Sequence, residues 1–223
     1  MAAVAHLAMS NKLRTVDIIV TRSEVPPGLA TALGREAAQG KLKCVRIKGA
    51  TWDLEVDLRT WESGELLFPG QAVNMPLLSA FFQGSGWPKK LTITSPSGAP
   101  MAGDPLLQLV KQAYQEGVQD LQVDRLRLDL AAMRRGELYV REQGLEDTDA
   151  ATLADILRDA RTAVREVDLG GNPVGPGAAA AVVWAAADAP EPCRHVRALG
   201  LSVDVERLAH QELVLEGEQM SAR

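Results

Sequence analysis

Residues 164–181 read VREVDLGGNPVGPGAAAA, and three local signals follow one another in this stretch. The apolar residues Val167 and Leu169 alternate with charged residues, which is typical of a strand with one buried face. Glycine and proline are concentrated in residues 170–177, which indicates a turn. The alanine-rich run that begins at residue 178 has helical periodicity and small side chains that allow close packing. The stretch therefore predicts a strand, a turn and a helix in succession.

The strand pattern of this stretch occurs six times: an apolar residue, two others, an apolar residue, one other, and an apolar residue. The central residues of successive copies are separated by 29, 46, 30, 46 and 29 positions. This alternation of short and long gaps defines a larger unit of about 75 residues, which indicates internal repetition. The central residues are Val16, Val45, Leu91, Leu121, Val167 and Val196.

A second pattern recurs in step with the first and contains an Asp followed eight residues later by a Glu. Its alternating apolar residues predict a β-hairpin or strand pair over 54–68, 126–140 and 201–215. The acidic residues could be catalytic carboxylates, or they could fix the corner of each hairpin by binding a backbone amide. The structural role is favoured because duplication explains three copies of a corner more simply than three active sites. The three pairs are Asp57 and Glu65, Asp129 and Glu137, and Asp204 and Glu212.

Residues 164–181 resemble a leucine-rich repeat of the long, ribonuclease-inhibitor-like type. The resemblance implies that the side-chain amide of Asn172 bonds backbone groups where the strand becomes the loop. It also implies a curved stack of repeats with helices on the convex side. The other copies depart from the family at the Asn position, and each long gap carries about 17 extra residues. The residues at that position are Thr21, Ala50, Pro96, Leu126 and Leu201.

We therefore expect an α/β protein: a leucine-rich-repeat-like solenoid with one curved parallel sheet, outer helices and three repeated β-hairpin insertions. Residues 1–12 are expected to form an N-terminal capping segment. Residues 13–223 are expected to form a single solenoid. Its repeating units are predicted to be 13–87, 88–163 and 164–223.

The composition excludes several classes of protein. The chain has 223 residues, of which 46% are apolar and 24% charged, so it can form a core. A net charge of −5 argues against a dedicated binder of nucleic acid or anionic membranes. Cys44 and Cys193 alone form no disulfide framework, and we expect reduced thiols. No apolar run reaches the ~18 residues of a membrane span, and we expect a soluble intracellular protein, cytoplasmic or organelle-associated.

Residues with catalytic or metal-binding chemistry are scarce. The histidines His6, His195 and His210 have no metal-ligand spacing, and no nucleophile motif is present. The run 84–90 contains Gly-Ser-Gly and two lysines but lacks the strand-to-helix context of a phosphate-binding loop. The glycine-rich run 170–177 could cradle an anion, although a turn in the repeat is the favoured role. We therefore predict no enzymatic activity, no cofactor and no metal.

Basic residues recur at the position that follows the first apolar residue of each strand pattern. If the strands stack, five of these six residues form a basic row, and neighbouring rows add further basic side chains. The row is interpreted either as a solvated strand edge balanced by nearby acids or as a docking stripe for an acidic peptide or protein surface. The predicted stripe consists of Arg14, Lys43, Arg46, Lys89, Lys90, Arg165, Arg194 and Arg197.

The function predicted from these features is a non-catalytic protein–protein interaction module, acting as a scaffold, an adaptor or a subunit of a larger assembly. Trp52 and Trp61 flank the first hairpin and either pack it or anchor a partner, whereas Trp184 is expected in the core. One alternative is an enzyme or ligand-binding protein built on the repeated Asp/Glu hairpins. Another is the ligand-sensing fragment of a larger regulatory protein.

Overall fold

The computed structural model divides the chain into two compact units, Met1–Met101 and Ala102–Arg223, which are described separately below. No helix in the described ranges is long and apolar enough to cross a membrane. The residues that the structure describes are 14–19, 25–49, 53–59, 64–69, 74–96, 101, 103–159, 164–191, 193–209 and 215–217.

The first unit contains two groups of paired strands. In the first group β1 (Thr15–Ile19) pairs in parallel with β2 (Cys44–Lys48), and β2 pairs antiparallel with β3 (Asp53–Asp57). In the second group β4 (Glu65–Pro69) and β5 (Lys90–Thr94) are parallel. Alternate side chains of these strands are buried, as the period of two in an extended chain requires.

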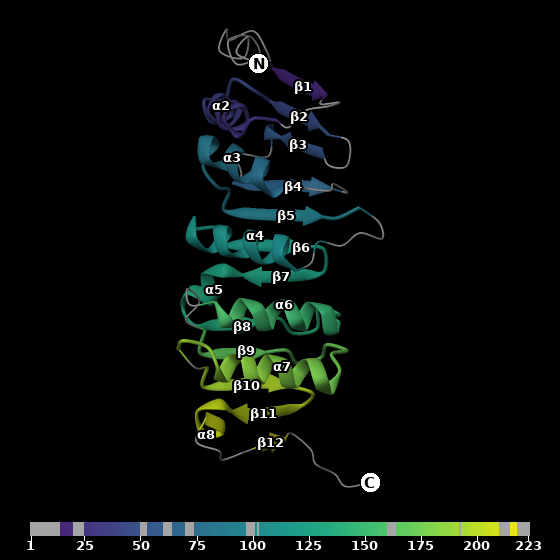
Figure 1. The fold of residues 1–223 in the computed structure, drawn as a ribbon, viewed down its shortest axis with the longest axis vertical. Coiled ribbons are helices and arrows are strands. Elements are labelled where there is room, and N and C mark those ends of the chain that lie inside the picture. The colour runs from purple at the N-terminus through teal and green to yellow at the C-terminus, as the bar shows by residue number, and fades with distance from the viewer. Residues whose placement is uncertain are drawn as a thin grey trace. The chain divides into compact units, whose positions relative to one another are not determined.

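Two helices of the first unit, α2 (Pro27–Ala38) and α3 (Met75–Ser85), pack closely against each other (Figure 1). Gly34 of α2 lies against the carbonyl oxygen of Phe81, and Gly84 of α3 lies against the carbonyl oxygen of Thr31. A Cβ at either glycine would overlap the facing backbone. The absence of both side chains therefore sets the distance between the two helices.

The second unit contains the hairpin of β6 (Asp120–Val123) and β7 (Leu126–Asp129), and a separate five-stranded sheet. The order of strands in the larger sheet is β12-β11-β10-β9-β8. Strands β8, β9 and β10 are parallel, whereas β11 is antiparallel to both of its neighbours. Their bounds are Glu137–Tyr139 for β8, Glu166–Asp168 for β9, His195–Ala198 for β10, Leu201–Asp204 for β11 and Leu215–Gly217 for β12.

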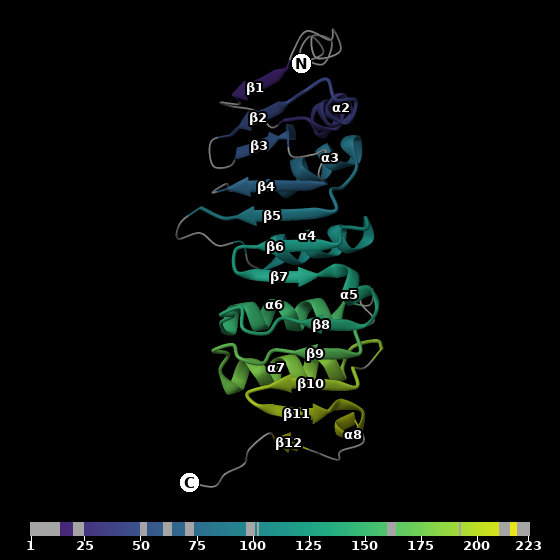
Figure 2. The same ribbon diagram turned by 180° about the vertical axis from the view of Figure 1, so that it is seen from behind.

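The helices α6 (Asp147–Arg158) and α7 (Pro176–Ala187) lie on one face of the five-stranded sheet (Figure 1). The view from behind shows the other face of that sheet, where no described helix lies over the strands (Figure 2). The remaining helices of this unit are α4 (Asp104–Gln115), α5 (Leu130–Arg134) and α8 (Val205–Ala209). The sheet of this unit thus has a covered face and an open face.

The α/β class is confirmed, but the predicted leucine-rich-repeat-like solenoid with one curved parallel sheet is wrong. Each unit holds separate groups of strands in mixed orientation. The reason is the length of certain connections. Only Leu199 and Gly200 separate β10 from β11, and both have positive φ, of 54° and 74°, as a tight hairpin turn requires. A parallel crossover needs about a dozen residues or more, so short connections of this kind enforce antiparallel pairing.

The three predicted hairpin insertions are also wrong as a repeated feature. In the first copy β3 pairs with the preceding strand β2, and β4 pairs with β5. In the second copy β7 pairs with the preceding strand β6. Only in the third copy do the two arms, β11 and β12, pair with each other. The sequence pattern identified strands but gave the wrong partners for β3 and β7, because pairing depends on connection length rather than on local alternation.

Candidate functional site

The open face of the five-stranded sheet brings together polar side chains from four strands. Because residues in adjacent strands are in register, they form two rows across this face. The buried residues Leu138, Val167, Val196 and Val203 lie between the rows in sequence and point toward the helices. One row consists of Glu137, Glu166, His195 and Asp204, and the other of Tyr139, Asp168, Arg197 and Ser202.

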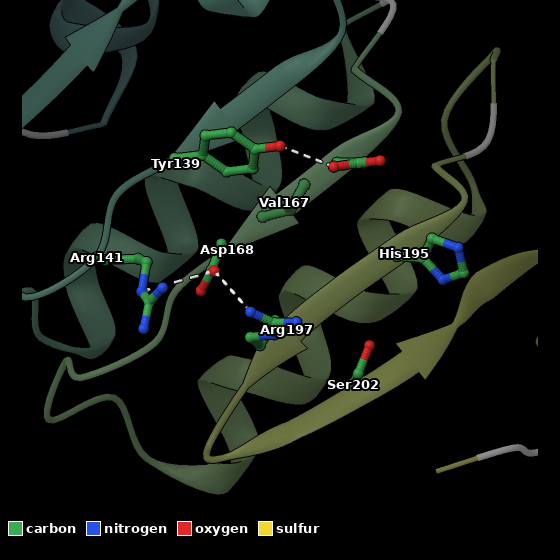
Figure 3. Close-up of a pocket in the computed structure, with 8 residues that line it drawn as sticks. Tyr139, Arg141, Val167, Asp168, His195, Arg197 and Ser202 are labelled. Carbon is green, nitrogen blue, oxygen red and sulfur yellow. Dashed lines mark hydrogen bonds and ion pairs between the residues drawn. The ribbon is translucent and has the colours of Figure 1, made fainter. Parts of the chain in front are cut away.

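A cavity of about 520 Å³ lies on this face, and all of its lining residues belong to the second unit (Figure 3). Both rows contribute to it, together with a residue that follows β8. The lining residues are Tyr139, Arg141, Glu166, Val167, Asp168, His195, Arg197 and Ser202.

Asp168 is the buried acidic residue at the centre of the cavity. Its side chain is only 10% exposed, whereas those of Arg141 and Arg197 are 55% and 51% exposed. The Oδ1 atom accepts a hydrogen bond of 2.8 Å from the backbone N–H of Gly170. The Oδ2 atom lies 3.7 Å from Nε of Arg141 and 3.6 Å from Nη1 of Arg197. One carboxylate thus holds two guanidinium groups, one on each side of β9 (Figure 3).

Gly170 permits this arrangement because it has no side chain to occupy the space beside Asp168 and Arg141. A Cβ at this position would lie 3.0 Å from Oδ1 of Asp168 and 3.4 Å from Nε of Arg141. Those distances are shorter than ordinary van der Waals contacts, so a larger residue would push against the ion pair. The glycine therefore leaves the space in which the Arg141 guanidinium approaches Asp168.

Tyr139 and Glu166 form a second polar pair in the cavity. The hydroxyl group of Tyr139 donates a hydrogen bond of 2.7 Å to Oε2 of Glu166 (Figure 3). This hydrogen bond raises the pKa of Tyr139 to about 12, and burial and the charges of nearby acids act in the same direction. The tyrosine is therefore held as a neutral donor, and the residue is 48% exposed at the surface of the sheet.

His195 and Ser202 complete the cavity wall on β10 and β11. His195 lies in register between Glu166 and Asp204 on the two neighbouring strands. Within the described ranges, no group of three or more His, Cys, Asp or Glu residues is placed to hold a metal ion. The chemistry that this wall offers is hydrogen bonding and charge.

The predicted basic row lies at the beginnings of strands. Arg14 and Lys43 are adjacent across β1 and β2, since the N–H of Lys43 donates to the carbonyl oxygen of Arg14 at 2.7 Å. Arg165 and Arg194 are adjacent across β9 and β10 through an equivalent bond of 2.7 Å. Lys89 immediately precedes β5. All five residues are exposed.

Several members of the predicted stripe form ion pairs with nearby acids. Arg46 lies 2.7 Å from Glu55 and 3.7 Å from Asp17, whereas Lys90 lies 3.2 Å from Glu65. Arg194 lies 3.6 Å from Glu206. Of the whole predicted stripe, Arg197 alone lines the cavity described above.

The repeated aspartates bind backbone amides at the turns that follow β3, β7 and β11. Asp57 accepts from the N–H of Arg59 at 3.0 Å. Asp129 accepts from the N–H of Ala132 at 2.7 Å, and Asp204 accepts from the N–H of Arg207 at 3.1 Å. Hydrogen bonding to Arg59 also lowers the pKa of Asp57. None of these aspartates lines the cavity.

The paired glutamates lie apart from the cavity as well. Glu65 pairs with Lys90, and Glu137 lies 3.6 Å from Arg135. Other residues named from the sequence fall outside the described ranges, together with the predicted capping segment 1–12. They are His6, Trp52, Trp61, His210 and Glu212.

Asn172 makes four hydrogen bonds to backbone groups at the ends of β8 and β9. Its Oδ1 accepts from the N–H groups of Gln143 and Leu145 at 2.9 and 3.1 Å. Its Nδ2 donates to the carbonyl oxygens of Val140 and Leu169 at 2.6 and 2.8 Å. The side chain thus ties together the segments that follow two neighbouring strands of the site.

Neither the cysteines nor Trp184 belong to the lining of the cavity. Cys193 is fully buried, and burial raises the pKa of its thiol to about 11. Cys44 is half-buried, and partial burial raises the pKa of its thiol as well. The prediction that Trp184 belongs to the core is wrong, because α7 buries Ala179, Val182 and their neighbours and leaves Trp184 56% exposed on its outer face.

Sequence reasoning missed Tyr139, Arg141 and Ser202 as members of a site. A signal for Tyr139 was present, since it lies between Leu138 and Val140, both of which are buried. Alternation places a residue in that position on the open face.

Comparison of the chain with protein-family models, with curated protein sequences and with solved structures finds no match.

Proposed function

We propose that this protein is a non-catalytic protein–protein interaction module that binds its partner on the open face of the five-stranded sheet. The observation that carries the proposal is the asymmetry of that sheet. One face packs its apolar residues against α6 and α7, whereas the other presents charged and aromatic side chains with no described helix over them.

The residues of the open face are those that commonly contribute most to binding energy. Tyrosine and arginine are enriched among the residues whose truncation weakens protein interfaces. Tyr139 and Arg197 lie in register on the same side of the sheet, with Asp168 between them. Hydrogen bonding to Glu166 and the ion pair with Asp168 restrict these side chains before a partner arrives. That restriction lowers the entropy lost on association.

The exposure of the cavity also favours a macromolecular partner. Pockets for small molecules usually enclose most of the ligand surface. Here the side chains of Arg141 and Arg197 are half exposed, and so is Tyr139. Side chains at this level of exposure suit a large complementary surface that covers them on binding.

The test compares two exposed aromatic residues of the same unit. Proteins that co-purify with the chain at native abundance are identified by mass and purified, and each is titrated against Tyr139→Ala and Trp184→Ala. We expect Tyr139→Ala to weaken binding of a true partner by about tenfold or more. We expect Trp184→Ala, on the outer face of α7, to leave affinity unchanged.

The reverse result, with Tyr139→Ala unchanged and Trp184→Ala impaired, would overturn the proposal. Recovery of the chain as a lone monomer that turns over a small molecule would also overturn it.

A further inference from the structure

We infer that the cavity on the open face binds a carboxylate side chain of the protein partner, from Asp or Glu, between the guanidinium groups of Arg141 and Arg197. The inference rests on the proposed function and specifies the chemistry that the partner must present. It is carried by the geometry around Asp168 and by the N–H donors that the two arginines do not use there.

The two guanidinium groups of the cavity share a single acidic partner, Asp168, since the other lining carboxylate, Glu166, accepts from Tyr139. Arg141 and Arg197 carry two positive charges, and Asp168 supplies one negative charge. In the described part of the chain, this ion pair is the only side-chain interaction of either arginine. Its distances of 3.7 and 3.6 Å are longer than those of N–H···O hydrogen bonds. Each guanidinium group therefore keeps N–H donors for a ligand.

The two guanidinium groups are held from opposite sides of β9. Arg197 belongs to β10, whereas Arg141 follows β8. Between them, Asp168 is fixed through its Oδ1 by the backbone N–H of Gly170 and is free to attract both arginines through its Oδ2. Figure 3 shows both arginines beside this carboxylate at the cavity. A guanidinium group binds the two oxygens of a carboxylate through its planar, forked N–H donors.

The remaining lining residues favour a single-charged ligand over a multiply charged one. A ligand with one negative charge meets less repulsion from the carboxylates of Asp168 and Glu166 than a phosphate dianion would. Glu166 on β9 also adds negative charge to the same cavity, where it accepts from Tyr139. A second negative charge on the ligand would meet this carboxylate. An Asp or Glu side chain of a protein therefore fits the electrostatics best.

The experiment uses random peptides of about 12 residues displayed on phage, selected on the full-length protein. Selected peptides are synthesised in pairs, with the shared acidic residue and with its amide counterpart, Asn or Gln. We expect the acidic peptide to bind the wild type at least about tenfold more tightly than the amide peptide. The double variant Arg141→Gln/Arg197→Gln should lose this discrimination.

Two further variants control for folding and for general charge effects. In Arg141→Lys/Arg197→Lys, Asp168 keeps cationic neighbours while the forked donors are lost, and we expect discrimination to fall several-fold. Arg158→Gln removes an exposed arginine of α6 that pairs with Asp155, and we expect it to retain full discrimination. Thermal unfolding of each variant verifies that it is folded.

The outcomes separate this inference from the proposed function. Peptides that share no acidic residue but lose binding to Tyr139→Ala would overturn the carboxylate inference and leave the interaction surface standing. Discrimination that survives in Arg141→Gln/Arg197→Gln, or competition by inorganic phosphate without binding of acidic peptides, would likewise overturn the inference. Peptides whose binding no substitution on the open face affects would overturn both.

Discussion

Asp168 illustrates how one buried carboxylate can organise the side chains around it. Burying a charge is unfavourable unless partners compensate for it. At Asp168 the compensation comes from the N–H of Gly170 and from two arginines, and the arginines in turn remain half exposed. Because Arg141 and Arg197 share this partner, we regard them as one functional unit whose substitutions will not have additive effects.

The hydrogen bond between Tyr139 and Glu166 predicts a distinctive titration. The chain has two tyrosines, so Tyr114→Phe leaves Tyr139 as the only phenol. We expect its ionisation, followed by ultraviolet absorbance, to show a pKa of about 12. In Tyr114→Phe/Glu166→Gln the pKa should move toward the ordinary value near 10.

The sign of the associated effect on stability follows from the direction of this pKa shift. The folded protein holds the proton of Tyr139 more tightly than the unfolded chain does. Its contribution to the free energy of unfolding is therefore complete below about pH 10 and is lost as the pH rises through about 12. An unchanged pKa in the Glu166→Gln background would show that this hydrogen bond does not form.

The half-buried side chain of Asn172 predicts a large loss of stability when it is removed. Asn172→Ala removes four hydrogen bonds and leaves two backbone N–H groups and two carbonyl groups without that partner. We expect the free energy of unfolding, measured with urea, to fall by about 2–4 kcal/mol. Asn172→Asp keeps the acceptor oxygen but loses both donated bonds, so it should also be destabilising.

A matched control for Asn172 is Gln108→Ala, which removes an exposed carboxamide from α4. It should change the free energy of unfolding by less than about 0.5 kcal/mol. Equal effects of the two substitutions would contradict the role assigned to Asn172.

At the scale of elements, helix contacts in the first unit depend on two glycines. Gly34 and Gly84 face each other's helix backbone, so α2 and α3 approach more closely than helices with side chains at the contact could. This close approach places Leu33, Leu78 and Phe81 in a core without exposed surface. The packing of the two helices therefore depends on residues that contribute no apolar area themselves.

Substitution of Gly34 or Gly84 by alanine is expected to change the free energy of unfolding far more than the same substitution at Gly28. Gly34→Ala or Gly84→Ala should lower the free energy of unfolding by at least about 2 kcal/mol, because the new methyl group overlaps backbone atoms that cannot move independently. Gly28→Ala, in the first turn of α2, meets no atom within 4 Å. It should be neutral or stabilising by up to about 1 kcal/mol. Denaturant unfolding of the three variants measures the contrast, which equal effects would refute.

Strand positions could be predicted from the sequence, but only some of the strand pairings could. Each of the six central residues of the repeated pattern lies in a strand. Val16 pairs in parallel register with Val45, and Val167 with Val196. In the first two copies β3 and β7 pair with the preceding strand rather than with the expected hairpin arm, because alternation records only which side chains are buried. The two-residue turn at Leu199 and Gly200 was the available signal for the correct pairing at β10 and β11.

At the scale of the whole molecule, the negative net charge disfavours non-specific electrostatic binding to polyanions. The charge of −5 coexists with exposed arginines that are mostly distributed among neighbouring acids. Attraction to polyanions by long-range charge is therefore opposed by the molecule as a whole. The proposed recognition of a carboxylate therefore depends on the local arrangement at Asp168 and not on net charge.

This charge distribution predicts weak affinity for nucleic acid. At about 150 mM salt, we expect a mixed-sequence DNA duplex to keep its electrophoretic mobility up to about 100 µM protein. The wild type and Arg141→Gln/Arg197→Gln should behave alike, because the proposed site is not a phosphate site. A mobility shift that the double variant abolishes would contradict both expectations.

Only part of the candidate site was accessible from the sequence. Arg197 belongs to the predicted basic stripe, and Asp168 lies within the strand predicted around Val167 and Leu169. Tyr139 belongs to β8, and Arg141 follows it. Glu166 of the neighbouring strand, which Tyr139 contacts, is 27 residues further along the sequence. Their place beside Asp168 depends on the register of β8 with β9, which no local pattern specifies.

The register of β9 has a consequence for how the surface can diversify. Its three residues assign Glu166 and Asp168 to one face and Val167 to the other. Gain or loss of a single codon within this strand would turn the valine outward and carry a charge into the interior. Descendants of this gene are therefore expected to alter their partner preference by exchanging residues one for one, with changes of length confined to the loops.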